Sequence, residues 1–178
     1  RMNFRELIGD YTSSKGIIFP FKTIGTNAPK NYDMSTTGSW INAKCIDRIP
    51  ALPLGATGAA IKSSDSIASV YFDLKSNEDE LWQYNQLVVL SEDELKTTSP
   101  LLVHGCDTIA PLSFEDGAYT FQLPYEASNG CVIFKGAEYS PITFRGIITQ
   151  NLYSGLTYHE AGINGASVPA WLRCEQFE

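Results

Sequence analysis

The sequence predicts an all-β fold, a sandwich or a barrel, in which residues 1–178 form one domain. Three observations lead to this prediction. Apolar and polar residues alternate with a period of two along several segments, as they do in a strand with one buried face. Turn-forming residues, 14 Gly and 9 Pro, are spread between these segments. Only 19% of the residues are charged, below the ~25% of typical globular domains, and a hydrophobic share of 43% is enough for a core.

The first element is predicted to be a short helix within an N-terminal arm of residues 1–15. Asn3 can cap the start of this helix. Four apolar side chains in the arm recur at helical spacing: Phe4, Leu7, Ile8 and Tyr11. Isolated helices of fewer than ~12 residues are marginal in water, so we expect the arm to dock on a neighbouring molecule.

Strand character begins after the arm. Residues 16–24 are rich in strand formers, and Pro20 restricts them to a sheet edge or a bulge. Residues 27–38 are loop by composition. Residues 41–49 suit a short connecting helix that the next proline ends. Residues 53–60 are apolar but rich in helix and strand breakers, which predicts a buried irregular connection.

The clearest strand is the segment 68–75, in which four apolar side chains alternate with polar ones. Phe72 from this strand and Phe121 from a later one are expected to point into one shared core. Six further segments have strand character: 81–90, 101–103, 119–125, 131–134, 142–150 and 168–174. About eight extended segments in total are typical of a β-sandwich or β-barrel.

The charge of the chain argues against two classes of partner. A net charge of −7, with 13 scattered basic residues, does not supply the clustered Lys and Arg that phosphate backbones and anionic membranes require. No apolar run approaches the ~20 residues of a membrane-spanning helix, so no membrane insertion is expected. The chain begins with Arg1, which indicates a processed product or part of a longer chain.

Cysteines and histidines are the first candidates for chemistry in this sequence. Four widely spaced cysteines without a CxxC pair predict free, mostly buried thiols and no zinc ribbon: Cys45, Cys106, Cys131 and Cys174. His104, Cys106 and Asp107 lie within four residues, but a cysteine nucleophile usually takes its base from elsewhere in the fold. The segment is interpreted as a loop histidine beside a buried cysteine.

Other motifs are also better explained without a ligand. His159 and Glu160 lack the second histidine of a zinc helix. The cluster Glu78-Asp79-Glu80 lacks the ladder of a calcium loop, and no GK[ST] follows Gly55 and Gly58. No catalytic, cofactor-binding or metal-binding residue is therefore assigned, and the chain is predicted to work by contacts and not as an enzyme.

Four segments resemble the jelly-roll capsid proteins of picorna-like viruses, in particular the iflavirus-, dicistrovirus- and marnavirus-like members from insects and marine hosts. They are residues 4–8 with Tyr11, residues 121–128, residues 172–177, and residues 45–47 ahead of the strand at 68–74. Their order and spacing agree across most of the chain. The chain departs from the family where residues 64–66 replace an Arg-Gly-Ser/Asp segment, and where Cys174 and Gln176 interrupt the closing Gly-Asp-Asp-Phe run.

This resemblance implies an eight-stranded antiparallel jelly-roll β-sandwich with a short N-terminal helix and short connecting helices. It implies a structural subunit of an icosahedral capsid, which assembles with the other capsid proteins of the virion around an RNA genome. Weak contact of the inner face with the RNA, and a location in the virion and in the host cytoplasm during assembly, would follow.

Two other functions compete with this one. A β-sandwich module that binds a receptor or a carbohydrate would be a stable monomer with an exposed groove. A hydrolase that depends on a cysteine or a metal would need Cys106 or His159 to converge with other groups in one pocket.

Overall fold

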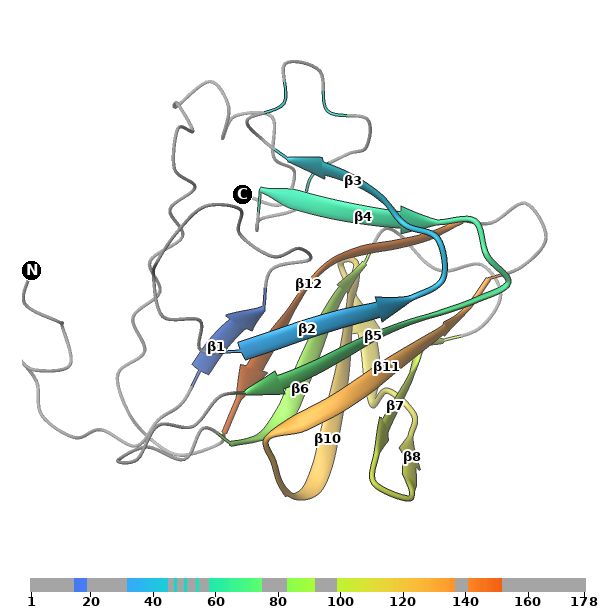
Figure 1. Cartoon of the computed structure of the whole chain (residues 1–178). Helices are drawn as coiled ribbons and strands as arrows, with labels where there is room; N and C mark the ends of the chain where they lie inside the picture. Colours follow the sequence, from blue (N-terminus) through green and yellow to red (C-terminus); the bar gives the residue numbers. More distant parts are fainter. Residues whose placement is uncertain are drawn as a thin grey trace, which may run out of the picture.

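A computed structural model of the chain describes residues 15–18 (backbone only), 32–44, 47, 50, 54, 58–74, 83–91, 99–136 and 141–151. These residues form twelve β-strands in two antiparallel sheets and no helix, which confirms the predicted all-β fold and is consistent with a β-sandwich (Figure 1). The strand number exceeds the expected eight. Among the same residues, no helix could cross a membrane.

The strands are numbered in the order in which they occur along the chain. The strands are β1 (Lys15–Ile18), β2 (Tyr32–Thr37), β3 (Ile41–Lys44), β4 (Ala59–Ser63), β5 (Ile67–Leu74), β6 (Tyr84–Ser91), β7 (Leu101–His104), β8 (Asp107–Ile109), β9 (Ser113–Glu115), β10 (Ala118–Ala127), β11 (Asn129–Lys135) and β12 (Ile142–Gln150). The seven-stranded sheet has the order β3-β4-β12-β6-β10-β9, with β1 also paired to β12. The five-stranded sheet has the order β2-β5-β11-β7-β8.

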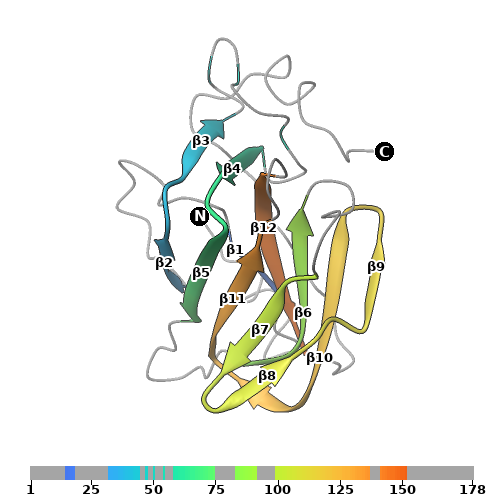
Figure 2. The same cartoon turned by 90° about the vertical axis from the view of Figure 1, so that its right-hand side faces the viewer.

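The core lies between the two sheets, which Figure 2 shows as two layers. Strand β5 buries every second side chain, as its alternating sequence predicts. Phe72 on β5 contacts Tyr84 on β6 of the other sheet, with ring centroids 5.6 Å apart. Phe72 and Phe121 are both fully buried in one cluster, which confirms their predicted shared core.

Strand β2 corrects the prediction of a loop over residues 27–38, because residues 32–37 pair along their whole length with β5. Its composition is polar because it is an edge strand with a largely exposed surface. Such a strand is held by backbone hydrogen bonds to its neighbour, and composition alone does not reveal this.

Strand β3 corrects the prediction of a short helix over residues 41–49, at least for its first four residues. Ile41–Lys44 pairs with β4 in the opposite sheet, so the chain crosses from one sheet to the other between β2 and β3. Gly38 lies at this crossing with a φ of +90°, a conformation that side chains disfavour. The Ser39 backbone N–H donates to Asp65 Oδ2 at 2.6 Å, which fastens the crossing to the β4–β5 connection.

The remaining predictions have mixed outcomes. The structure confirms strands at 68–74, 84–90, 101–103, 119–125, 131–134 and 142–150. Of the first predicted strand, residues 16–18 lie in β1 and the rest falls outside the described residues. Strand β4 begins inside the segment predicted to be irregular. Strands β8 and β9 were not predicted. The helix at residues 3–11 and the strand at 168–174 lie outside the described residues.

Candidate functional site

The four residues that suggested a catalytic dyad form a β-hairpin turn. Strands β7 and β8 are antiparallel, and His104 pairs directly with Asp107, so that Gly105 and Cys106 alone make the loop. Gly105 has a φ of +57°. Two-residue hairpin loops favour glycine in such a conformation at their first central position. Turn formation therefore accounts for the Gly-Cys pair without catalysis.

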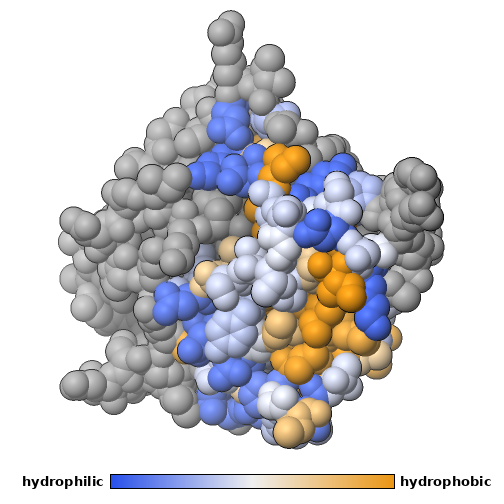
Figure 3. All heavy atoms as spheres, turned by 45° about the vertical axis from the view of Figure 1, so that its right-hand side comes forward, coloured by the Kyte–Doolittle hydropathy of each residue, from blue (hydrophilic) through white to orange (hydrophobic). Residues whose placement is uncertain are grey.

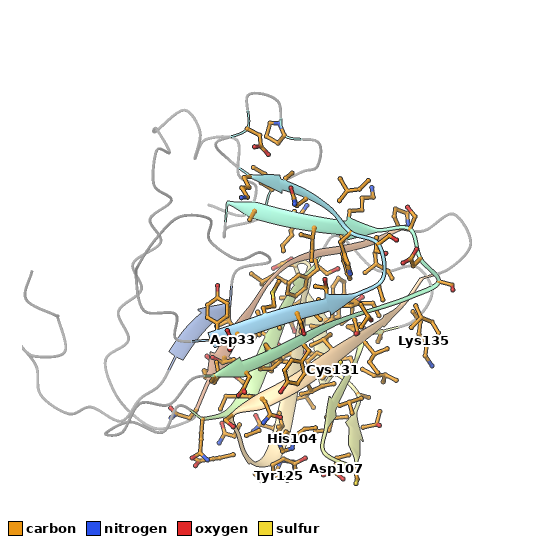
Figure 4. All side chains as sticks on the ribbon, viewed as in Figure 1. Asp33, His104, Asp107, Tyr125, Cys131 and Lys135 are labelled. Carbon is orange, nitrogen blue, oxygen red and sulfur yellow. The ribbon has the colours of Figure 1, made fainter. Side chains whose placement is uncertain are left out.

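Tyr125, on β10 of the seven-stranded sheet, joins the two ends of this turn (Figure 4). Its hydroxyl donates a hydrogen bond to Asp107 Oδ2 at 2.7 Å. His104 Nδ1 lies 3.3 Å from the same hydroxyl, and the two rings are 5.3 Å apart. Because the phenol proton is given to Asp107, the imidazole must carry a proton on Nδ1 to complete the second bond. The three side chains tie the hairpin to the opposite sheet.

The alternation over residues 119–125 puts Tyr125 on the same side of the strand as residues 119, 121 and 123. Those three are buried, but Tyr125 is only partly so. The pairing of β10 with β6 shifts register between Gln122 and Ala127, and a shift of this kind re-aims the side chains within it. Pro124 indicates such an irregularity in the sequence, because proline has no backbone N–H to donate to the neighbouring strand of the sheet.

Two tyrosines have raised pKa values for different reasons. The hydrogen bond to Asp107 raises the pKa of Tyr125 above 10.0, with smaller contributions from desolvation and from the charge of that carboxylate. Burial raises the pKa of Tyr84 further, and the nearby Tyr125 adds to the shift. The Tyr84 hydroxyl donates to the Asn129 carbonyl at 2.8 Å, which satisfies it inside the core.

We expect Asp107→Asn to lower the pKa of Tyr125 toward the ordinary value of 10.0, because it removes the acceptor carboxylate and its negative charge. The pKa of Tyr125 is higher in the folded chain than in the unfolded chain. The stabilisation of the fold by Tyr125 is therefore complete below pH ~10 and is lost as the pH rises through the pKa of the folded chain. NMR titration of labelled tyrosine rings measures the midpoint, with Tyr125→Phe assigning the signal. An unchanged midpoint in Asp107→Asn would show that the hydrogen bond is absent in solution.

The cysteines that the structure describes are unpaired but not buried. Cys106 is exposed in the hairpin turn and Cys131 is half-buried on β11. The prediction of free thiols is confirmed for these two, and the prediction that they are buried is wrong. Cys106 is exposed because its residue forms the loop and not a strand. Cys45 and Cys174 lie outside the described residues.

The other candidates do not assemble into a site within the described part of the chain. His159, Glu160, Gly55 and the acidic cluster 78–80 fall outside it. Among the described residues, no group of three or more His, Cys, Asp or Glu could hold a metal ion. The expectation that the protein is not an enzyme stays a prediction.

Within the described part of the chain, one candidate for binding is the solvent side of the five-stranded sheet, which we term the outer face. Among the residues that alternate with the buried ones on β5, β11 and β7, six are apolar and four are polar or charged. Figure 3 shows hydrophobic side chains gathered on this side of the molecule. Ile67 and Tyr71 are 62% and 42% exposed. The apolar residues of the outer face are Ile67, Tyr71, Leu101, Val103, Cys131 and Ile133.

Strand register makes these residues contiguous. Cys131 lies between Tyr71 and Val103 on the neighbouring strands, and Ile133 lies beside Leu101. Charged residues stand at the two ends of the same face. Asp33 and Asp73 are directly opposite each other at one end, and Lys135 stands beside Ile67 at the other (Figure 4).

No model of a known protein family matches the chain, and no curated protein is significantly similar to it.

Proposed function

We propose that the chain is a structural subunit of an icosahedral picorna-like capsid, which assembles with other capsid proteins of the same virion around an RNA genome. The proposal starts from the four sequence segments that resemble such proteins. The observation that carries it further is the order in which the strands pair. In this function the chain makes contacts with other subunits and catalyses no reaction.

The pairing order supports a jelly roll. Eight strands form nested antiparallel pairs, in which the first pairs with the last and the innermost two form a hairpin. The pairs are β4 with β12, β5 with β11, β6 with β10, and β7 with β8. When such a ribbon rolls up, its pairs fall alternately into two sheets, here β4-β12-β6-β10 and β5-β11-β7-β8. Double-sheet jelly rolls of eight strands are the fold of many viral capsid domains.

Four strands then extend this arrangement at its edges. Strands β2 and β3 run beside β5 and β4 and cross between the sheets with them. Strand β9 extends the other side of the larger sheet, and β1 pairs with the part of β12 that lies beyond β4. Additions at the edges leave the nested order intact.

The surface of the chain also suits a subunit that is covered by neighbours. Contiguous apolar patches on soluble proteins commonly mark interaction sites, and the outer face presents one across three adjacent strands. A low charged share of 19% fits the same role. Fold alone does not select this function, because lectin domains use the jelly roll as well.

The test is the state of the chain in its source, examined by sedimentation of a native extract through a density gradient with an antibody against the chain. We expect the chain in large, uniform particles that also contain other jelly-roll proteins and nuclease-protected RNA. A clean monomer that binds glycans on an array would contradict the capsid function and favour the binding module.

We also expect deletion of residues 1–11 to leave folding intact and to abolish particle assembly, since that segment is too short to be a stable helix alone. Circular dichroism and thermal unfolding measure the fold, and electron microscopy of the co-expressed capsid proteins measures assembly. The same number of residues replaced by a Gly-Ser sequence controls for length. Particles of normal yield from the deletion variant would show that the arm is ordinary local structure.

A further inference from the structure

We propose that Asn129 is a site of irreversible deamidation, which the native pairing of β11 suppresses and which opening of the corner between β10 and β11 permits. The corner consists of residues 127–129, where the chain leaves the seven-stranded sheet and enters the five-stranded one (Figure 1). This chemistry belongs to the folded chain and does not depend on the capsid function. Three features of the corner lead to the inference: the glycine after Asn129, the hydrogen bonds that hold it, and the charge on the opposite strand.

The sequence Asn129-Gly130 is intrinsically reactive. The backbone nitrogen of the following residue attacks Cγ of the asparagine side chain, forms a five-membered succinimide and expels ammonia. Water then opens the ring at either carbonyl. The product is aspartate or, with the main chain running through Cβ and Cγ, isoaspartate. Glycine has no side chain to obstruct the attack, so Asn-Gly pairs are the ones most prone to this reaction.

Packing requires the glycine that makes Asn129 reactive. Gly130 is buried, and a Cβ at this position would lie 2.8 Å from Tyr84 Oη and 3.0 Å from Phe72 Cζ. Tyr84 lies on β6 and Phe72 on β5, so a larger residue would have to displace core side chains of both sheets. The fold therefore keeps a reactive neighbour beside Asn129.

The attacking nitrogen is held in the sheet as long as the chain is folded. The Leu74 backbone N–H donates to the Ser128 carbonyl at 2.7 Å, so these two residues form a hydrogen-bonded pair. Bonded and non-bonded pairs alternate along antiparallel strands, so the Gly130 N–H donates to Phe72. This N–H must be released before its nitrogen can attack. Release needs local opening of the strand, the same event that permits hydrogen exchange of the amide.

Tyr84 holds the other side of the same peptide group. Its hydroxyl donates to the Asn129 carbonyl at 2.8 Å, and this carbonyl shares a peptide plane with the Gly130 nitrogen. Hydrogen bonds on both sides therefore fix the plane that must rotate for the ring to close. Asn129 itself is half-buried on the outer face, where water reaches the ring once the corner has opened.

The products hinder return to the native pairing. Asp73 lies directly opposite Asn129, in a non-hydrogen-bonded pair, where side chains of adjacent strands are closest. An aspartate at position 129 places two carboxylates face to face, and like charges in that position destabilise a sheet. An isoaspartate lengthens the main chain by a carbon atom between the bonds of Ser128 and Gly130, which displaces the register. A corner that has reacted therefore opens more readily than before.

Peptide mapping by mass spectrometry measures deamidation in the native chain and in urea at the same pH. The other Asn-Gly pair of the sequence, Asn164-Gly165, provides an internal standard in urea, where we expect both asparagines to react at similar rates. In the native chain Asn129 should react at least about tenfold more slowly than in urea, by the factor that protects the Gly130 N–H from hydrogen exchange. Equal rates of Asn129 in the two states overturn the proposal, as does an Asn129 that stays unreactive in urea while Asn164 reacts.

Tyr84→Phe tests whether opening of the corner controls the rate. It removes the hydrogen bond to the Asn129 carbonyl and should speed deamidation of the native chain roughly twofold to tenfold, with no change in urea. Ser91→Ala is the matched control, because it loses a buried hydrogen bond to the Thr143 carbonyl at the opposite end of β6. We expect Ser91→Ala to leave the rate unchanged. Equal acceleration by the two variants overturns local opening at the corner.

Asn129→Asp reproduces the charge of one product. We expect it to speed hydrogen exchange at Gly130 by roughly twofold to fivefold, and Asp73→Asn in the same chain to cancel this increase, since it removes the opposing carboxylate. Circular dichroism confirms that each variant is folded. Exchange at Gly130 that is no faster in Asn129→Asp than in the wild type overturns the effect assigned to the product.

Discussion

Replacing Phe72 by Ala should destabilise the folded chain by about 3–5 kcal/mol, the typical effect of truncating a buried Phe. Phe72 is fully buried, and its ring meets the Tyr84 ring of the opposite sheet at 5.6 Å. The loss would remove a large part of the 5–15 kcal/mol that stabilises a typical domain. Chemical denaturation, followed by tryptophan fluorescence, measures the change in the free energy of unfolding.

The adjacent residue offers a matched control. Tyr71 lies on the same strand but points to the outer face, where it is 42% exposed. Tyr71→Ala should cost less than about 1 kcal/mol, because it loses only cross-strand contacts at the surface. Equal effects of the two substitutions would mean that the register of β5 is displaced by one residue, since such a shift exchanges the two faces of a strand.

The second large effect is expected for Gly130→Ala on β11. An added Cβ at this position would lie 2.8 Å from Tyr84 Oη, 3.0 Å from Phe72 Cζ and 3.1 Å from Leu102 Cδ1. Overpacking of this kind costs about 1–3 kcal/mol, which exceeds the roughly 0.5–1 kcal/mol that alanine gains over glycine within a strand. We therefore expect net destabilisation, measured by the same denaturation experiment.

A double-mutant cycle with Tyr84→Phe identifies the cause. Alone, Tyr84→Phe loses the buried hydrogen bond to the Asn129 carbonyl, which costs about 1 kcal/mol. In the Gly130→Ala background the same change also removes the closest clashing atom, so its cost should be smaller. Strictly additive effects would show that the crowding at Gly130 is relieved elsewhere and that our account of this glycine is wrong.

Several strands could be predicted from the sequence because their pattern has a local cause. Strand β5 and the first half of β10 each bury one face, so an apolar residue stands at every second position. The pattern appears in the sequence whatever the strand pairs with. Phe72 and Phe121 could be assigned to the core on this basis, and both are fully buried.

Strands at the edges could not be predicted in this way. The polar residues 32–37 form β2 only because β5 offers them a row of backbone partners, 32 or more positions further along the chain. Likewise β3 exists because β4 lies beside it, and not because residues 41–44 prefer an extended backbone. Backbone hydrogen bonds form between strands whatever their side chains are. The composition of an edge strand therefore gives little indication that it is a strand.

The candidate sites show the same division. The sequence places His104 and Asp107 within four residues, and it predicts strands at 68–75 and 131–134, the first of them with an outward row of polar side chains. Only the tertiary structure brought Tyr125 from the other sheet between His104 and Asp107. It alone also joined the outward rows of β5, β11 and β7 into one apolar face with opposite charges at its ends. The alternation of apolar and polar residues shows which side of a strand faces solvent. Pairing between distant segments decides which strands share that side.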